Sequence, residues 1–353
     1  MIDTVFRWFK SYLSDRTQSF IYAGQQTPSF PVYCSVPQGS VLGPVEFTAY
    51  TEDITELLIK HDTQSHLYAD DTQLYASCKY EDIDAIRERL SKCIADIAVW
   101  CASRRLQLNA NKTEVIWFGS RSNLAKLKGR DCSVCIGSES IKPSTIVRDL
   151  GVHLDDELTM KQHVAKVAAS CFYHLRRLRQ IRRRVGTEVT TQLVLAFVTS
   201  RLDYCNSVLA GLPQVTLEPL QRVQNAAARL ILDLNLWDHV TPGLRQLHWL
   251  PIRWRIQYKL CSIMQSIHAG KSPVYMTECV RTVADSASRS GLRSANSSLY
   301  ATPWLRTKFG ERAFSYAGPS AWNSLPAEIR DDTDFSAFRS KLKTHFFNLA
   351  YNT

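Results

Sequence analysis

The sequence has no apolar run long enough to cross a membrane and no apolar leader at its start. Its longest apolar runs, such as residues 194–198, fall far short of the roughly 20 residues that a spanning helix needs. The first ten residues mix acidic, basic and aromatic side chains, unlike a secretory signal. These absences predict an intracellular protein without membrane contact, and they do not distinguish nucleus from cytoplasm.

The sequence also lacks a cysteine pattern typical of disulfides or of a structural zinc site. Ten cysteines outside a secretory context favour reduced thiols. Only Cys132 and Cys135 have C-x-x-C spacing, and no second pair follows to complete four zinc ligands. Because Cys132, Val134 and Ile136 fall on alternate positions, we favour a strand over a metal site here.

One basic segment contains no acid at all. Residues 161–184 include eight Lys or Arg and no Asp or Glu, and six of these basic residues lie within 176–184. Residues 45–100, by contrast, hold twelve acids against five bases. The charges are therefore distributed unevenly along this chain of net charge +10. The positive electrostatic potential of the basic segment favours binding of a polyanion.

With 45% hydrophobic residues, the chain has enough apolar material for two or three packed domains. Apolar residues at helical spacing predict a helix from Pro44 to about Lys60, with the proline in its first turn. Residues 66–76 predict two short strands separated by residues 70–73, with two aspartates near the tip. Apolar positions from 83 to 101 predict an amphipathic helix of about five turns.

Further strands are expected at 114–118, 132–136 and 146–154, where glycines 119, 137 and 151 mark breaks or bends. The rest of the chain shows helical stripes, and the polar stretch 286–298 predicts a loop. The stripes cover residues 160–178, 193–204, 220–231 and 256–267. The fold class is therefore α+β, with a mixed N-terminal part followed by a helical region.

The segment Tyr68–Asp71, with sequence YADD, carries adjacent carboxylates at a hairpin tip. Such carboxylates can hold the two divalent ions of nucleotidyl transfer, but Asp-Asp also occurs in ordinary solvated turns. Upstream, residues 35–44 read SVPQGSVLGP, a turn-rich segment that opens a helix. Glycine there lets the backbone approach a ligand closely.

Together these two motifs and their spacing resemble the reverse transcriptases of LINE-type, non-LTR retrotransposons, in particular the jockey-like branch. In that family a P-Q-G-S-V-L-G-P segment precedes a Y-A-D-D or F-A-D-D hairpin by about 25 to 30 residues. The resemblance extends over essentially the whole chain. It includes residues 8–16, 106–109, 111–114, 149–152, 202–206 and 321–326.

The resemblance implies a metal-binding site at Asp70, with Asp71 supporting it or the primer end. It implies further that four residues shape the nucleotide and template pocket: Pro37, Gln38, Gly39 and Tyr68. Lys112 is the candidate proton donor to the leaving pyrophosphate, and a solvated loop lysine remains an equal alternative.

Leu150 and Gly151 correspond to the family's primer-contacting turn, and the basic segment falls where the thumb contacts duplex phosphates. The candidate phosphate-binding residues are Arg176, Arg177, Arg179, Arg182, Arg183 and Arg184. The implied organisation is a partial polymerase palm with a metal-site β-hairpin at 1–156, a helical thumb at 157–235 and a mainly helical C-terminal extension at 236–353.

The implied activity is synthesis of DNA on an RNA template from a DNA primer, with deoxynucleoside triphosphates as substrates and Mg²⁺ as cofactor. Complete enzymes of the family carry the fingers and another metal-binding aspartate ahead of the segment matched by residues 8–16. Asp3 has no preceding strand and is not accepted as its substitute. We therefore expect an N-terminally incomplete enzyme, without the endonuclease domain common in such elements, that is inactive by itself.

Two alternatives stay open at this point. The chain could act as a non-catalytic nucleic-acid-binding remnant through its basic segment, or it could be a fragment without independent function. The sequence does not indicate an oligomeric state.

Overall fold

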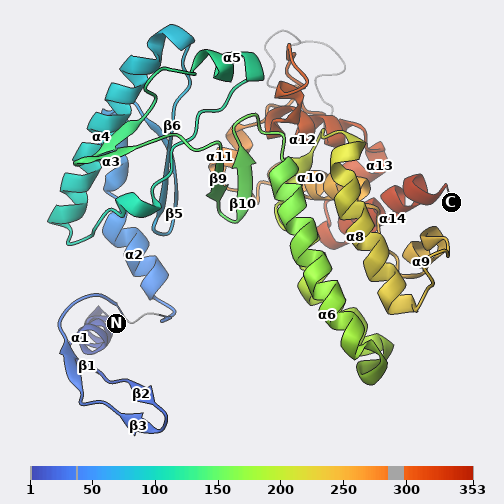
Figure 1. The fold of residues 1–353 in the computed structure, drawn as a ribbon, viewed down its shortest axis with the longest axis horizontal. Helices are drawn as coiled ribbons and strands as arrows, with labels where there is room; N and C mark the ends of the chain where they lie inside the picture. The colour runs from blue at the N-terminus through green and yellow to red at the C-terminus, as the bar shows by residue number, and fades with distance from the viewer. Residues whose placement is uncertain (1, 37–38, 285–297, 353) are drawn as a thin grey trace. The chain divides into compact units, whose positions relative to one another are not determined.

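The computed structural model describes residues 2–36, 39–284 and 298–352 (Figure 1). Helices and strands are mixed, as the α+β assignment predicts, and the chain divides into two compact units. Unit 1 comprises residues 1–115 and 123–143, and unit 2 comprises 116–122 and 144–353. The loop predicted at 286–298 lies outside the described residues except for Ser298.

Unit 1 begins with helix α1 (Ile2–Leu13) and four short strands. Strand β1 (Arg16–Gln18) pairs antiparallel with β4 (Phe30–Val32), and β2 (Ile21–Tyr22) pairs with β3 (Gln25–Gln26). Two helices follow, α2 (Gly43–Thr51) and α3 (Ile54–Lys60), and Pro44 lies in the first turn of α2 as predicted.

The single helix expected from Pro44 to Lys60 is wrong, because the chain turns between α2 and α3 at Glu52 and Asp53. The Thr51 hydroxyl donates to the Phe47 carbonyl at 2.8 Å, a side-chain bond that bends helices. Asp53 then forms an ion pair with Arg104, which follows directly after the helix of residues 83–103. Apolar spacing does not report such polar contacts.

The centre of unit 1 is a hairpin packed beside a long helix. Strands β5 (Gln64–Tyr68) and β6 (Asp71–Tyr75) pair antiparallel, and the 3-10 turn η1 (Tyr80–Asp82) leads into α4 (Ile83–Ser103). The predicted amphipathic helix is therefore confirmed. Its buried face packs on α3, and the small core consists of Ile54, Leu58, Cys93, Ile97 and Cys101.

The later part of unit 1 departs from prediction at one strand. After η2 (Ala110–Lys112), residues 114–118 form no strand ladder, because the chain passes from unit 1 to unit 2 between Val115 and Ile116. After α5 (Arg121–Lys126), β7 (Val134–Ile136) pairs with β8 (Glu139–Ile141) and packs on α4. Cys132 is buried and Cys135 exposed, consistent with the strand interpretation of this segment.

Unit 2 opens with a hairpin of β9 (Ile146–Asp149) and β10 (Val152–Asp155) and is otherwise helical. The long helix α6 (Lys161–Val194) lies beside α8 (Gln214–Leu232), as Figure 1 shows. Between them run the π-helical η3 (Leu195–Thr199), α7 (Ser200–Asp203) and η4 (Asn206–Leu209). The remaining helices are α9 (Val240–Gln246), α10 (Ile252–His268), α11 (Val274–Glu278), η7 (Gly310–Arg312), α12 (Phe314–Asn323), α13 (Ala327–Arg330) and α14 (Phe335–Tyr351).

A single hydrophobic core joins the helices of unit 2, from Val152 to Phe346. The apolar stripe of α6 buries Val164, Cys171, Leu175 and Leu178, as the sequence pattern predicts, whereas Val167 is only half-buried and its neighbour Ala168 is buried. Residues 157–235 and 236–353 therefore share one core rather than having one each. Among the described helices, none combines the length and apolar composition that a membrane span requires.

Candidate functional site

Asp70 lies at the tip of the β5–β6 hairpin. Tyr68 is paired with Asp71 across a two-residue turn, Ala69 and Asp70, so the turn is shorter than the four residues expected from sequence. Ala69 has φ +53°, the left-handed region in which primed hairpin turns place their first residue and where glycine is usual. Both carboxylates are exposed, and the Tyr68 side chain is 66% exposed beside them.

The chemistry of this tip fits a hard divalent cation only in part. Carboxylate oxygens are the ligands that Mg²⁺ prefers, and Asp70 and Asp71 supply them from adjacent positions. In the described part of the chain, however, no group of three or more His, Cys, Asp or Glu is arranged to hold a metal ion. Among the described His, Cys, Asp and Glu side chains, the hairpin thus presents two carboxylates without a third such ligand grouped with them.

Of the glycine-rich segment, residues 35–36 and 39–44 are described, and Pro37 and Gln38 lie outside the described residues. Gly39 has φ +80°, and a Cβ added there would meet nothing within 4 Å. Backbone conformation alone therefore requires this glycine. Ser40 fixes the exit of the segment, because its hydroxyl accepts from the Tyr12 hydroxyl at 2.7 Å and from the Gly43 amide at 3.2 Å.

Lys112 lies in the same unit as the hairpin, at the end of η2. The Asn109 side chain accepts from the Lys112 amide at 3.2 Å, and the Thr113 hydroxyl donates to the Asn109 carbonyl at 2.9 Å. The Lys112 side chain is exposed and makes no ion pair with any described residue. The structure does not bring it into contact with Asp70 or Asp71.

Leu150 and Gly151 form the turn of the β9–β10 hairpin. Their φ angles, +41° and +85°, are those of a type I′ turn. The Tyr204 hydroxyl donates to the Leu150 carbonyl at 2.5 Å, and a Cβ added to Gly151 would lie 3.3 Å from Tyr204 Cε1. The sequence contains both motifs, but nothing in their spacing indicates that they touch.

The arginines of α6 divide into two groups. Arg182 is half-buried, and its guanidinium donates to the Leu230 and Ile231 carbonyls at 3.0 Å each and to the Thr187 hydroxyl at 2.9 Å. It therefore caps the end of α8. The other five are exposed and make no ion pair within the described ranges: Arg176, Arg177, Arg179, Arg183 and Arg184.

The C-terminal motif of residues 321–326 has a structural role. Trp322 is fully buried in the unit 2 core, and its indole N–H donates to the Ser298 carbonyl at 2.9 Å. The Asn323 side chain accepts from the Tyr300 amide at 3.0 Å and donates to the Tyr300 carbonyl at 2.7 Å. These bonds hold the segment around Tyr300 against α12.

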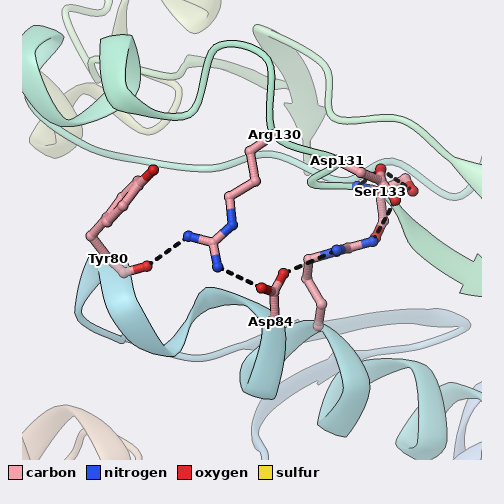
Figure 2. Close-up of polar contacts among 6 residues, drawn as sticks. Tyr80, Asp84, Arg130, Asp131 and Ser133 are labelled. Carbon is pink, nitrogen blue, oxygen red and sulfur yellow. Dashed lines mark hydrogen bonds and ion pairs between the residues drawn. The ribbon is translucent and has the colours of Figure 1, made fainter.

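Sequence reasoning missed a polar cluster that joins α4 to the segment before β7 (Figure 2). Arg130 donates to the Tyr80 carbonyl at 3.0 Å and to Asp84 at 2.6 Å. This hydrogen bond with Arg130 is the main reason that the pKa of Asp84 is lowered, and the same bond raises the pKa of Arg130.

The second half of the cluster centres on Arg87, on the predicted polar face of α4. Its guanidinium donates to Asp131 at 2.7 Å, to Asp84 at 3.2 Å and to the Ser133 carbonyl at 2.8 Å (Figure 2). Hydrogen bonds from Ser133 are the largest cause of a lowered pKa at Asp131. The cluster holds β7 against α4. Asp131 and Ser133 lie 44 and 46 residues from Arg87, too far along the chain for a local pattern to predict, whereas Asp84 is three residues away.

Comparison with known proteins shows what the part of the chain that holds this site is similar to. Residues 1–154 match the family model described as reverse transcriptase (RNA-dependent DNA polymerase). The match includes the Asp70 hairpin, the glycine-rich segment, Lys112 and the Leu150 turn.

The relatives specify the branch. The chain is 27% identical over 164 residues to the RNA-directed DNA polymerase from mobile element jockey of Drosophila melanogaster, covering 45% of this chain and 17% of the relative. It is 30% identical over 187 residues to the probable RNA-directed DNA polymerase from transposon BS of the same organism, covering 50% and 20%. The chain thus spans about a fifth of the length of these relatives. The resemblance to reverse transcriptases of jockey-like, non-LTR elements is confirmed.

Proposed function

We propose that residues 1–154 form part of the palm of a retrotransposon RNA-directed DNA polymerase, which copies RNA into DNA by two-metal-ion nucleotidyl transfer. The observation that supports this most is the β5–β6 hairpin, which presents Asp70 and Asp71 at an exposed tip inside the region that matches reverse transcriptases. Asp70 would be the metal ligand, and Asp71 would support it or the primer end.

The surrounding residues have roles suited to binding. The open backbone at Gly39, with Pro37 and Gln38, would leave room for template and nucleotide, since no side chain projects from the glycine. Tyr68, exposed next to Asp70, would line the same pocket. Lys112 would hold a proton for the leaving pyrophosphate, which requires it to approach the substrate when template and primer are bound.

Residues 157–235 would act as the thumb. The five exposed arginines of α6 form a cationic surface that favours phosphates irrespective of base sequence. The rigid type I′ turn at Leu150 and Gly151 would contact the primer, and Tyr204 would hold it in position. Residues 236–353 would be a C-terminal extension packed on the same core.

Mg²⁺ bound at such a site would neutralise charge that develops on the transferred phosphate. The hairpin supplies two carboxylates, and within the described residues no third metal ligand accompanies them. We therefore propose that the 353-residue polypeptide expressed by itself does not catalyse synthesis, and we assign no catalytic step to it. A second palm strand with its own aspartate would complete the site.

Primer extension tests this proposal in two arms. The polypeptide alone, given an RNA template, a DNA primer and Mg²⁺ or Mn²⁺, should show no extension. A chimera that adds the upstream palm and fingers of the jockey polymerase should extend the primer, and Asp70→Ala should reduce its rate by about a hundredfold or more. The control Asp82→Ala, on η1, should retain activity. Extension by the polypeptide alone that depends on Asp70 would contradict the proposed inactivity.

A second candidate function is nucleic-acid binding without catalysis. The exposed arginines of α6 favour it specifically, because they make no ion pair with any described acid. Salt-dependent binding to RNA, together with a chimera that stays inactive although it folds, would support this candidate over the polymerase.

A further inference from the structure

A cavity of about 570 Å³ lies within unit 2, among the η3–η4 segment, the α9–α10 connection, α10 and α14. This volume falls in the range usual for small-ligand sites. Its charged lining is almost entirely basic. Arg255 and Lys259 come from α10, Arg339 and Lys343 from α14, and the one acid is Asp203.

Only one of these four basic side chains is neutralised. Arg255 donates from Nε to Asp203 Oδ1 at 2.8 Å and from Nη2 to Asp203 Oδ2, a two-point pair that balances the charge of Arg255. Lys259, Arg339 and Lys343 make no ion pair with a described residue. Three cations without a described counter-ion therefore line one cavity: Lys259 is half-buried, whereas Lys343 and Arg339, which also lies over the Phe335 ring at 4.2 Å, are exposed.

The spacing of these charges is unfavourable to the helices themselves. Arg255 and Lys259 are four residues apart on α10, as are Arg339 and Lys343 on α14, and the two helices pack together. Like charges at this spacing destabilise a helix. Lys341, on another side of α14, does not line the cavity and pairs with Asp332 at 2.7 Å. An anion in the cavity would give Lys259, Arg339 and Lys343 a counter-ion, as Asp332 does for Lys341.

Asn206 adds a second, independent indication of a ligand. It lines the cavity with only 3% of its surface exposed, and its Nδ2 donates to Asp203 Oδ1 at 3.4 Å. Its Oδ1 is buried and accepts no hydrogen bond from the described residues. A buried acceptor without a donor is costly, and because less than 1 Å² of this oxygen is accessible, a ligand N–H or O–H group reaches it only when the Asn206 side chain turns toward the cavity.

We propose that this cavity binds a nucleotide, with its phosphate held by Lys259, Arg339 and Lys343 and an N–H or O–H donor directed at Asn206. The nucleotide could be free or one unit of an RNA strand, since both offer the same phosphate and donor chemistry. The residues that line the cavity include neither the Asp70 hairpin nor the α6 arginines, so the proposal does not depend on the proposed polymerase function.

Lysine acetylation of the wild-type chain provides the first test, because it requires no mutation. An RNA of roughly 12 nucleotides, a length within the range of single-strand binding sites, should slow acetylation of Lys259 and Lys343 several-fold. Lys341 should react at an unchanged rate. Protection by uridine monophosphate as well would identify the free nucleotide as sufficient, and protection by RNA alone would identify the strand. If neither ligand protects the two lysines at low salt, the proposal is wrong.

Substitution provides the second test, in a chain whose α6 arginines 176, 177, 179 and 183 are already Gln. Adding Lys259→Gln and Lys343→Gln should lower the slope of log RNA affinity against log salt by about 1.4, since each single-strand phosphate contact contributes about 0.7. The matched control Lys271→Gln with Lys341→Gln removes the same charge outside the cavity and should leave the slope unchanged. Equal slopes in the two double variants would overturn the proposal, whatever the α6 substitutions do.

Discussion

The Tyr204 hydroxyl donates a hydrogen bond to the carbonyl of Leu150, which lies 54 residues earlier in the chain. This bond ties the helical part of unit 2 to the tip of the β9–β10 hairpin. The turn is a strained one for Leu150, whose φ is +41°. The Tyr204 hydrogen bond therefore adds to the β9–β10 pairing in favouring this conformation of the proposed primer-contacting turn.

Removing that hydroxyl should loosen the turn. Tyr204→Phe is expected to reduce the free energy of unfolding by about 1 kcal/mol, the net contribution of a typical hydrogen bond. Hydrogen exchange at the amides of residues 150–152 should rise at the same time. Tyr173→Phe is the matched control, because Tyr173 is similarly exposed, at 51% against 53%. Equal effects of the two substitutions would show that the Tyr204 hydrogen bond does not contribute to the free energy of unfolding.

Gly186 should resist substitution for reasons of backbone alone. It interrupts α6 with φ +73° and ψ −178°, a conformation open almost only to glycine, and a Cβ added there would meet nothing within 4 Å. Gly186→Ala should therefore cost about 1 to 3 kcal/mol in urea unfolding. The exposed neighbour Glu188→Ala should change stability by less than about 0.5 kcal/mol. A neutral or stabilising Gly186→Ala would mean that the helix does not break there.

Stability should fall in acid through the cluster of Figure 2. Hydrogen bonds with Arg130 and Ser133 lower the pKa of Asp84 and Asp131 below the ordinary 3.8. A lowered pKa contributes stability above the unfolded value, and this contribution is lost as pH falls through the folded value. Asp84→Asn should therefore destabilise the chain at pH 6 and flatten the loss of stability below pH 3.8. Glu81→Gln is the control, and identical pH profiles for the two variants would exclude the cluster as a source of acid sensitivity.

Local sequence patterns predicted those elements in which the spacing of apolar residues alone determines the buried face. The stripes of α4, α6, α8 and α10 are long enough for helical spacing to determine both the element and its buried face. The short apolar runs on either side of residues 70–73 likewise predicted the hairpin, although the turn was expected to be two residues too long. Pairing of Asp71 with Tyr68 depends on strand register, which the turn residues did not reveal.

What the sequence could not show depends on contacts between distant residues. Arg182 belongs to the same basic run as its neighbours, yet it alone bonds carbonyls of α8, 48 and 49 residues away. The strand expected at 114–118 failed because the chain passes between units there. The cavity cations Lys259 and Lys343 converge only because α10 packs on α14.

The salt dependence of binding to an RNA–DNA duplex tests most directly whether the α6 arginines of unit 2 bind nucleic acid. If about five arginines contact phosphates, log affinity against log salt should have a slope near −4, since each contact contributes about −0.9. Replacing Arg176, Arg177, Arg179 and Arg183 with Gln should flatten the slope by about three units and weaken all sequences alike. Replacing Arg253, Lys271, Arg306 and Lys308 removes equal charge elsewhere and should change it little. A wild-type slope near zero, or equal slopes for the two quadruple variants, would contradict the assignment of α6 as a phosphate-binding thumb.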